Sequence, residues 1–231
     1  MINSCGISEA KRIWDSAGMT AESLCVACLF EDEALLREQL DLSDMFGART
    51  LVIITGGFEA LKSAGHDGDI DYARSLLVER LALAAELADS YRVRLAFEPL
   101  HPMVCGFRSI VSTLQESLDI LDQMDDSHDI GLAIDTYALW WEHDLQEKLK
   151  RAGRRILNYH VSDWLADTRD LRLDRGMPGD GQIALCDWRH MIEAAGYFGP
   201  IEVEIFSRDR WWKTPAEKMI EEIIQRMNSA F

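Results

Sequence analysis

Short apolar runs alternate with longer segments of helical periodicity along this chain, and that alternation limits the possible folds more than any other feature. The runs have the length of β-strands, and the segments between them repeat apolar residues at the spacing of amphipathic helices. The apolar runs occupy residues 24–30, 50–57, 93–100, 129–136, 156–163 and 200–207. Strands that alternate with helices predict a parallel sheet whose strands are joined by right-handed crossovers.

The helical segments also carry recognisable start and stop signals. Thr214-Pro215-Ala216-Glu217 forms a capping box with proline at the first helical position, which predicts a final helix from there. Glycines at 47, 153 and 196 end three of the other helices. The remaining helices are predicted within residues 8–18, 33–47, 70–91, 109–124, 143–153 and 187–196.

The number of strands is compatible with two architectures. A chain of 231 residues suits one α/β barrel of about 200–250 residues, and no linker or change of composition divides it, so we predict a single domain over residues 1–231. Only six strands can be placed, however, and a helix precedes the first of them. Six strands could form an open doubly wound sheet or the last six units of an eight-stranded barrel.

Charge excludes several classes of partner. The chain has 24 Lys and Arg against 40 Asp and Glu, a formal net charge of −16, and it contains no basic stripe, so we expect neither nucleic acid nor an anionic membrane as a partner. The N-terminus lacks the charged-then-apolar order of a signal peptide, and no apolar run reaches membrane-spanning length. These features predict a cytoplasmic protein.

The five cysteines do not suggest a disulfide framework. Cys25 and Cys28 form a C-x-x-C pair that could serve redox or zinc chemistry. The pair lies inside an apolar run, and strand residues three apart point to opposite faces, so we interpret both as core residues.

Four consecutive strands each end in a residue type that binds metals. The third to sixth strands end in Glu98, Asp135, His160 and Glu204. The carboxyl ends of parallel strands share one edge, and three unpaired carboxylates there would repel one another unless a cation joined them. The set suits Mn²⁺, Mg²⁺ or Co²⁺ better than a structural zinc site. A structural alternative for each residue taken alone is a helix cap, a salt bridge or a core histidine.

Strand periodicity predicts which side chains share the face of these ligands. Ala96 lies on the same face as Glu98, and Ala133 on the same face as Asp135, while the bulky neighbours of both point to the helices. Small or polar side chains on one face are what a closed interior with a polar mouth requires.

At these residues the sequence resembles the xylose isomerase-like TIM-barrel superfamily, in particular its sugar phosphate isomerase/epimerase group. That group includes inosose dehydratase, hydroxypyruvate isomerase and tagatose-type 3-epimerases. The motifs that carry the resemblance are FEPLHP (97–102), AIDTYALWW (133–141), YHVSDW (159–164), RGMPGDG (175–181) and IEVEIFS (201–207). The resemblance implies an α/β fold of the (β/α)8 barrel type.

The same resemblance implies a metal-dependent isomerase or epimerase. One divalent ion would be held by Glu98, Asp135, His160 and Glu204, with Mn²⁺ the expected ion and Mg²⁺, Co²⁺ or Zn²⁺ as alternatives. Glu98 and Glu204 would also act as acid and base, moving a proton next to a metal-bound carbonyl of a small sugar, sugar phosphate or keto-polyol.

Further residues near the matching motifs are predicted to contact substrate. His101 has a loop-capping role as its alternative, the arginines could be solvated loop charges, and the tryptophans could serve packing alone. These predicted substrate contacts are His101, Trp140, Trp141, Trp164, Arg169 and Arg175.

Two departures from the family pattern stand out. Many relatives carry Asp-x-x-His on the strand that ends in Asp135, and this chain has Ala138 in place of that histidine. Relative to eight strands, the first strand, its helix and the second strand are absent, so we expect an incomplete barrel and hypothesise a misassigned start codon or an incomplete gene. The open wall would expose apolar surface that a homodimer could cover.

Three other functions compete with the isomerase or epimerase. An inosose-type dehydratase needs the same metal and the same proton abstraction, and a catalytically impaired paralogue would only bind a sugar. Endonuclease activity of the kind found on a related barrel would need a basic DNA-binding rim, which the net charge disfavours.

Overall fold

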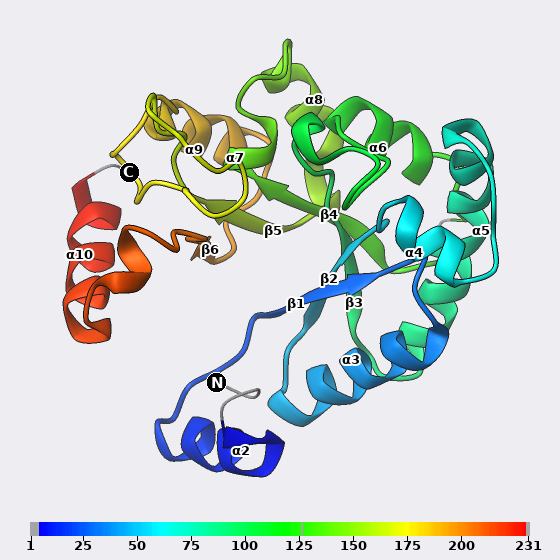
Figure 1. Ribbon diagram of the computed structural model, residues 1–231, viewed down its shortest axis with the longest axis horizontal. Helices are drawn as coiled ribbons and strands as arrows, with labels where there is room; N and C mark the ends of the chain where they lie inside the picture. Colours follow the sequence, from blue (N-terminus) through cyan, green and yellow to red (C-terminus); the bar gives the residue numbers. More distant parts are fainter. Residues whose placement is uncertain (1–4, 126, 230–231) are drawn as a thin grey trace.

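Six parallel strands in one sheet form the centre of the computed structural model, which describes residues 5–125 and 127–229 (Figure 1). The strands pair in chain order with parallel neighbours throughout. They are β1 (Ser23–Cys28), β2 (Thr50–Ile54), β3 (Arg94–Phe97), β4 (Ile130–Asp135), β5 (Ile156–Val161) and β6 (Ile201–Val203). All six predicted strands are therefore confirmed, each shorter than its apolar run.

The sheet curves into a half-barrel of the TIM-barrel type, as expected for an incomplete barrel. Strands β1 and β6 are the two edges of the sheet, and they do not pair with each other within the described residues. A side-chain hydrogen bond links these edges, with Ser23 Oγ donating to Glu202 Oε2 at 2.7 Å. Asn158 Nδ2 on β5 donates to Glu202 Oε1 at 2.6 Å, so Glu202 on β6 accepts hydrogen bonds from both β1 and β5.

Helices cover the outer face of the sheet (Figure 1). Asp32 and Thr113 cap α3 and α6 through hydrogen bonds to backbone N–H groups, and Gly47 ends α3 in the left-handed conformation. The α-helices are α2 (Ile7–Ser16), α3 (Glu33–Phe46), α4 (Phe58–Ser63), α5 (Ile70–Asp89), α6 (Leu114–Leu121), α7 (Thr136–Leu139), α8 (Leu145–Ala152), α9 (Leu185–Ala194) and α10 (Ala216–Ser229). The short 3-10 helices are η1 (Pro102–Val104), η2 (Gly153–Arg155) and η3 (Trp211–Lys213).

The core divides as strand periodicity predicts. Leu95 and Phe97 are fully buried between the sheet and its helices, whereas Val52, Ala96 and Ala133 form a small cluster on the inner face. Small side chains therefore fill the inner face of the half-barrel. The polar residues that follow them in each strand lie at its rim.

Cys25 and Cys28 correct the sequence interpretation. Cys25 is exposed and Cys28 half-buried, so the assignment of both to the core is wrong. Strand β1 is an edge of the sheet, and no neighbouring strand covers its open side among the described residues. The apolar run that predicted burial is therefore buried on one side only.

Across the described ranges, no helix combines the length and the apolar character that crossing a membrane requires.

Candidate metal centre

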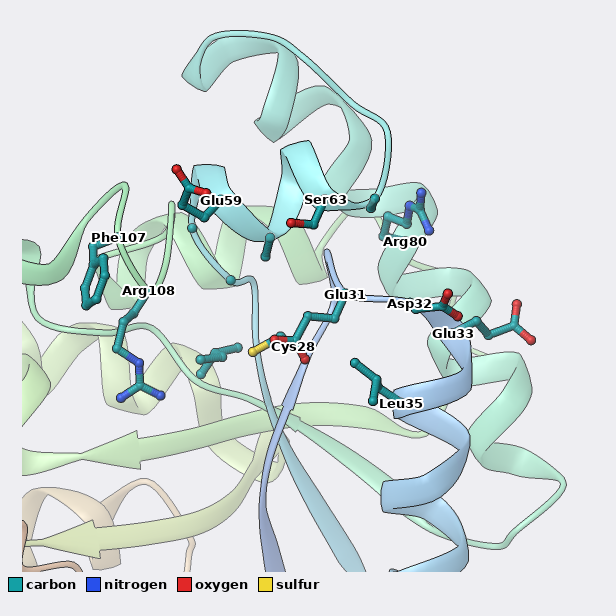
Figure 2. Close-up of a pocket in the computed structure, with 15 residues that line it drawn as sticks. Cys28, Glu31, Asp32, Glu33, Leu35, Glu59, Ser63, Arg80, Phe107 and Arg108 are labelled. Atoms are coloured by element: carbon teal, nitrogen blue, oxygen red, sulfur yellow. The ribbon is translucent and has the colours of Figure 1, made fainter.

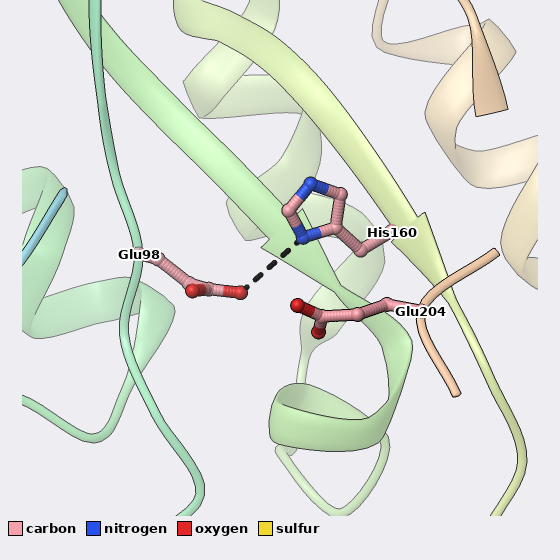
Figure 3. A group of neighbouring side chains, drawn as sticks. All are labelled: Glu98, His160 and Glu204. Carbon is pink, nitrogen blue, oxygen red and sulfur yellow. Dashed lines mark ion pairs between the residues drawn. The ribbon is translucent and has the colours of Figure 1, made fainter. Parts of the chain in front are cut away.

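Three of the four predicted ligands meet at the carboxyl edge of the sheet. His160 lies on β5, and Glu98 and Glu204 directly follow β3 and β6. The ligand atoms of these three side chains all lie within 4.8 Å of one another. Figure 3 shows the two carboxylates approaching from different strands, with the imidazole beside them.

The sheet ladder fixes both glutamates although neither belongs to a strand. The backbone N–H of Glu98 donates to Ile53 O at 2.9 Å, and that of Glu204 donates to Val161 O at 3.0 Å. Each residue thus continues the hydrogen bonding of its strand by one step, and its side chain projects at the rim.

The donor set fits a divalent cation. Glu98 is 6% exposed and His160 1% exposed, yet Glu98 Oε1 and both ring nitrogens of His160 make no hydrogen bond within the described chain. Nδ1 of His160 and Oε1 of Glu98 are 3.4 Å apart. Buried polar atoms normally have partners, and two carboxylates with one imidazole are ligands that Mn²⁺, Co²⁺ or Zn²⁺ accept.

Protons compete for the same atoms. Burial raises the pKa of Glu204 to about 7; Arg175 opposes this rise, and the negative charges of Glu98 and Asp135 reinforce it. For His160, burial acts to lower the pKa, but the nearby Cys25 and Glu98 outweigh burial and hold the pKa well above its usual value. Both groups must lose a proton before they bind a metal.

Asp135, the fourth predicted ligand, is engaged by other partners. Its Oδ1 accepts the N–H of Tyr137 at 2.9 Å, capping α7, and its Oδ2 accepts Arg175 Nη1 at 2.9 Å. It is not one of the three residues whose ligand atoms converge. Its role as a metal ligand stays a prediction.

Arg175 connects the predicted ligands through one nitrogen. Nη1 also donates to Glu204 Oε2 at 3.0 Å and to Ser162 Oγ at 3.3 Å, and the guanidinium stacks over the rings of Tyr137 and Phe206. Three carboxylates, those of Glu98, Asp135 and Glu204, against one guanidinium leave a formal charge of −3 + 1 = −2, counted on the ionised side chains and with His160 neutral. A divalent cation would balance that charge.

Sequence reasoning missed Asp163, which shapes the loop carrying Arg175. This fully buried carboxylate accepts backbone N–H groups from both ends of the turn at 179–183. A Cβ added to Gly181 would come within 2.2 Å of the Trp164 carbonyl oxygen, so the turn needs glycine there. The signal was present as an aspartate just after β5, but an aspartate after a strand is read first as a ligand or a helix cap.

Aromatic rings form one group beside Arg175, whose guanidinium lies over the ring of Tyr137. His101 stacks on Trp164 with centroids 4.9 Å apart, and Trp164 stacks on Tyr137 at 4.8 Å. Trp140 and Trp141 join this group through contacts of 5.5 Å with Trp164 and 6.0 Å with His101. The structure therefore gathers four predicted substrate contacts into one wall, and it adds Tyr137, which sequence reasoning had not singled out.

Two of the predicted substrate contacts also fit their alternative roles, which are a loop cap for His101 and a solvated loop charge for Arg169. His101 Nδ1 accepts the N–H of Met103 at 3.2 Å and so caps η1. Arg169 is exposed, and its backbone N–H donates to Asp174 Oδ2 at 2.9 Å. Substrate contact by either residue stays a prediction.

A family comparison agrees with this geometry. Residues 31–230 match the sequence profile of the family described as the xylose isomerase-like TIM barrel. The chain belongs to this family. No curated protein matches the sequence.

Solved structures of the same fold include protein SMc04130 from Sinorhizobium meliloti 1021, which is 38% identical with a TM-score of 0.88, over 99% of this chain and 85% of that one. The IolI protein, solved with a bound zinc atom, is 18% identical with a TM-score of 0.79 over 99% and 82%. The 3-keto-D-glucoside 4-epimerase YcjR of E. coli is 16% identical with a TM-score of 0.70 over 96% and 84%. The last two show a shared fold.

In this xylose isomerase-like chain, Ala138 lies on α7 and is buried within an apolar core cluster. Its carbonyl oxygen accepts a hydrogen bond from Trp141 Nε1 at 2.8 Å.

Proposed function

We propose that the protein is a divalent-metal-dependent isomerase or epimerase of a small sugar or keto-polyol. The observation that carries the proposal is the pair of carboxylates, Glu98 and Glu204, which reach the same imidazole from β3 and β6. Membership of the xylose isomerase-like family and a fold shared with a 3-keto-D-glucoside 4-epimerase support this class of reaction.

The residues present would divide the chemistry among them. Glu98, His160 and Glu204 would hold the cation, with Asp135 as the predicted fourth ligand, and Mn²⁺ is the ion we expect. When bound, the cation supplies Lewis-acid polarisation of a substrate carbonyl, which makes the neighbouring C–H more acidic. One of the two glutamates would then remove that proton and the other would return it.

The surrounding side chains support this division. Arg175 holds Glu204 and Asp135 in position through charged hydrogen bonds. The aromatic wall of His101, Tyr137 and Trp164 would offer apolar ring faces to the C–H groups of a sugar and exclude water from one side. We place this activity in cytoplasmic carbohydrate metabolism.

Metal loading and proton exchange test the proposal together. The purified protein would be stripped, reloaded with Mn²⁺ and analysed for metal content, then incubated with a panel of ketoses and inososes in D₂O under NMR observation. We expect one bound ion per chain and exchange of a C–H next to a carbonyl. Glu98→Gln and Glu204→Gln should each slow exchange by about 10²-fold or more, whereas the exposed control Glu221→Gln should not.

The outcomes separate the competing functions. Exchange without loss of water supports an isomerase or epimerase, and exchange with loss of a hydroxyl indicates a dehydratase. A chain that binds none of Mn²⁺, Mg²⁺, Co²⁺ or Zn²⁺ would overturn the enzyme proposal and leave the sugar-binding paralogue.

A further inference from the structure

A cavity opens at the carboxyl edge of the sheet, the same edge that carries the metal centre. Its volume is about 800 Å³, within the range of ligand pockets. Cys28 and Ile54, the last residues of β1 and β2, form part of its lining, as does Arg108 from the loop before α6. Figure 2 shows the Arg108 side chain directed toward the strands, away from the outer helices.

Arg108 is a half-buried cation to which the described chain gives neither an ion pair nor a side-chain hydrogen bond. Most other arginines of this acidic protein are paired; Arg151 and Arg155, for example, both donate to Asp122. A guanidinium that has lost part of its water and gained no acidic partner is set up to bind an anion from outside the chain.

Strand pairing brings the cavity lined by Arg108 next to the metal centre, because β2, whose last residue lines the cavity, pairs with β3, which Glu98 directly follows. Burial lowers the pKa of Arg108, and the positive charge of Arg172 lowers it further, while Cys28, Glu98 and Glu204 act in the opposite direction. These contributions agree with the position that the strand pairing gives. Arg172 is exposed and also has no ion pair within the described residues.

Four acidic side chains also line this cavity, those of Glu31, Asp32, Glu33 and Glu59. All four are exposed to solvent, where water and salt screen their charges, although Glu31 also lies beside Cys28. The half-buried Arg108 is screened less, so its attraction for an anion persists at short range.

We propose that Arg108 binds an oxyanion group at the end of the substrate remote from the reacting carbons, either a phosphate ester or a carboxylate. This inference rests on the proposed function, because it assigns the anionic end to the cavity and the carbonyl end to the metal centre. It narrows the substrate class from small sugars in general to anionic ones.

Anion binding by metal-free protein tests the inference without relying on turnover. Dissociation constants for inorganic phosphate and for malonate would be measured by ligand-observed NMR at low ionic strength. We expect one of the two anions to bind, and its dissociation constant to rise about tenfold or more in Arg108→Gln. Arg108→Lys, which keeps the charge but loses the planar fork, should fall between wild type and Arg108→Gln.

A matched control and a second titration keep the result interpretable. Arg154 is an exposed arginine in η2, before β5 and so at the opposite end of the sheet, and Arg154→Gln should leave anion binding unchanged. Mn²⁺ titrations of the same variants should match wild type, which shows that they are folded. Preference for phosphate indicates a sugar phosphate, and preference for malonate a sugar acid.

Two results would overturn the inference. One is a wild-type protein that binds neither anion, and the other is an Arg108→Gln variant that binds as wild type does. If Mn²⁺ still binds in either case, the proposed function survives without the anion site. If anions bind at Arg108 but Mn²⁺ does not bind, the proposed function fails and the anion site stands.

Discussion

Replacing Asp163 by asparagine should lower the free energy of unfolding by about 2–4 kcal/mol. The Asp163 side chain is fully buried. Its Oδ1 accepts the N–H groups of Trp164 at 2.9 Å and Ile183 at 3.0 Å, and its Oδ2 accepts those of Gly179 at 3.0 Å and Gly181 at 2.8 Å. Asparagine keeps one oxygen, so two of these donors would face an NH₂ group, each at a cost of about 1–2 kcal/mol.

Urea unfolding followed by tryptophan fluorescence measures this loss, with Asp170→Asn as the control. Asp170 Oδ1 also accepts two backbone N–H groups, from Arg172 and Leu173, both at 3.0 Å. Asp170 is half-exposed, so water can replace those bonds, and we expect a loss below about 1 kcal/mol. The reasoning is refuted if Asp163→Asn costs no more than Asp170→Asn.

Three further predictions concern the site and its supports. The affinity for Mn²⁺ should weaken as the pH falls from 8 to 6, by up to about tenfold per pH unit for each proton that must leave His160 or Glu204. A constant affinity measured by calorimetry would contradict the raised pKa values of these two residues. Gly181→Ala should lower the thermal midpoint through a loss of about 1–3 kcal/mol, because its Cβ would collide with the Trp164 carbonyl, and an unchanged midpoint would argue against this turn. Glu142→Ala should cost about 2–4 kcal/mol in urea unfolding, since this buried carboxylate pairs with Lys148 and accepts the first N–H of α6; a loss under 1 kcal/mol would mean that water replaces it.

The strands and their inward residues could be predicted because parallel sheets obey two local rules. Each apolar run contains one strand, and alternation along the strand decides which residues face inward, as Ala96 and Ala133 do. The strand order follows from short right-handed connections, which place consecutive strands side by side. These rules brought Glu98, His160 and Glu204 to one edge without any knowledge of tertiary contacts.

Features that depend on what lies across the sheet could not be predicted in this way. Cys25 has the apolar neighbours of a core residue, but its exposure depends on β1 being an edge strand, which no local pattern records. Asp135 has the position of a metal ligand, but its partner Arg175 comes from a loop 40 residues later in the chain. Hydrophobic periodicity carries no information on which loop folds over the rim.

The position of Arg175 follows from that loop, and it changes the electrostatics of the candidate centre. Without the guanidinium of Arg175, the carboxylates of Glu98, Asp135 and Glu204 would carry three negative charges, one more than a divalent cation balances. With the guanidinium, the net charge is −2, which a divalent cation balances. Arg175 can supply this charge only because Asp163 and Gly181 hold the turn that follows it. Residues that touch neither metal nor substrate therefore determine the charge at the site, and they should be as sensitive to substitution as the predicted ligands are.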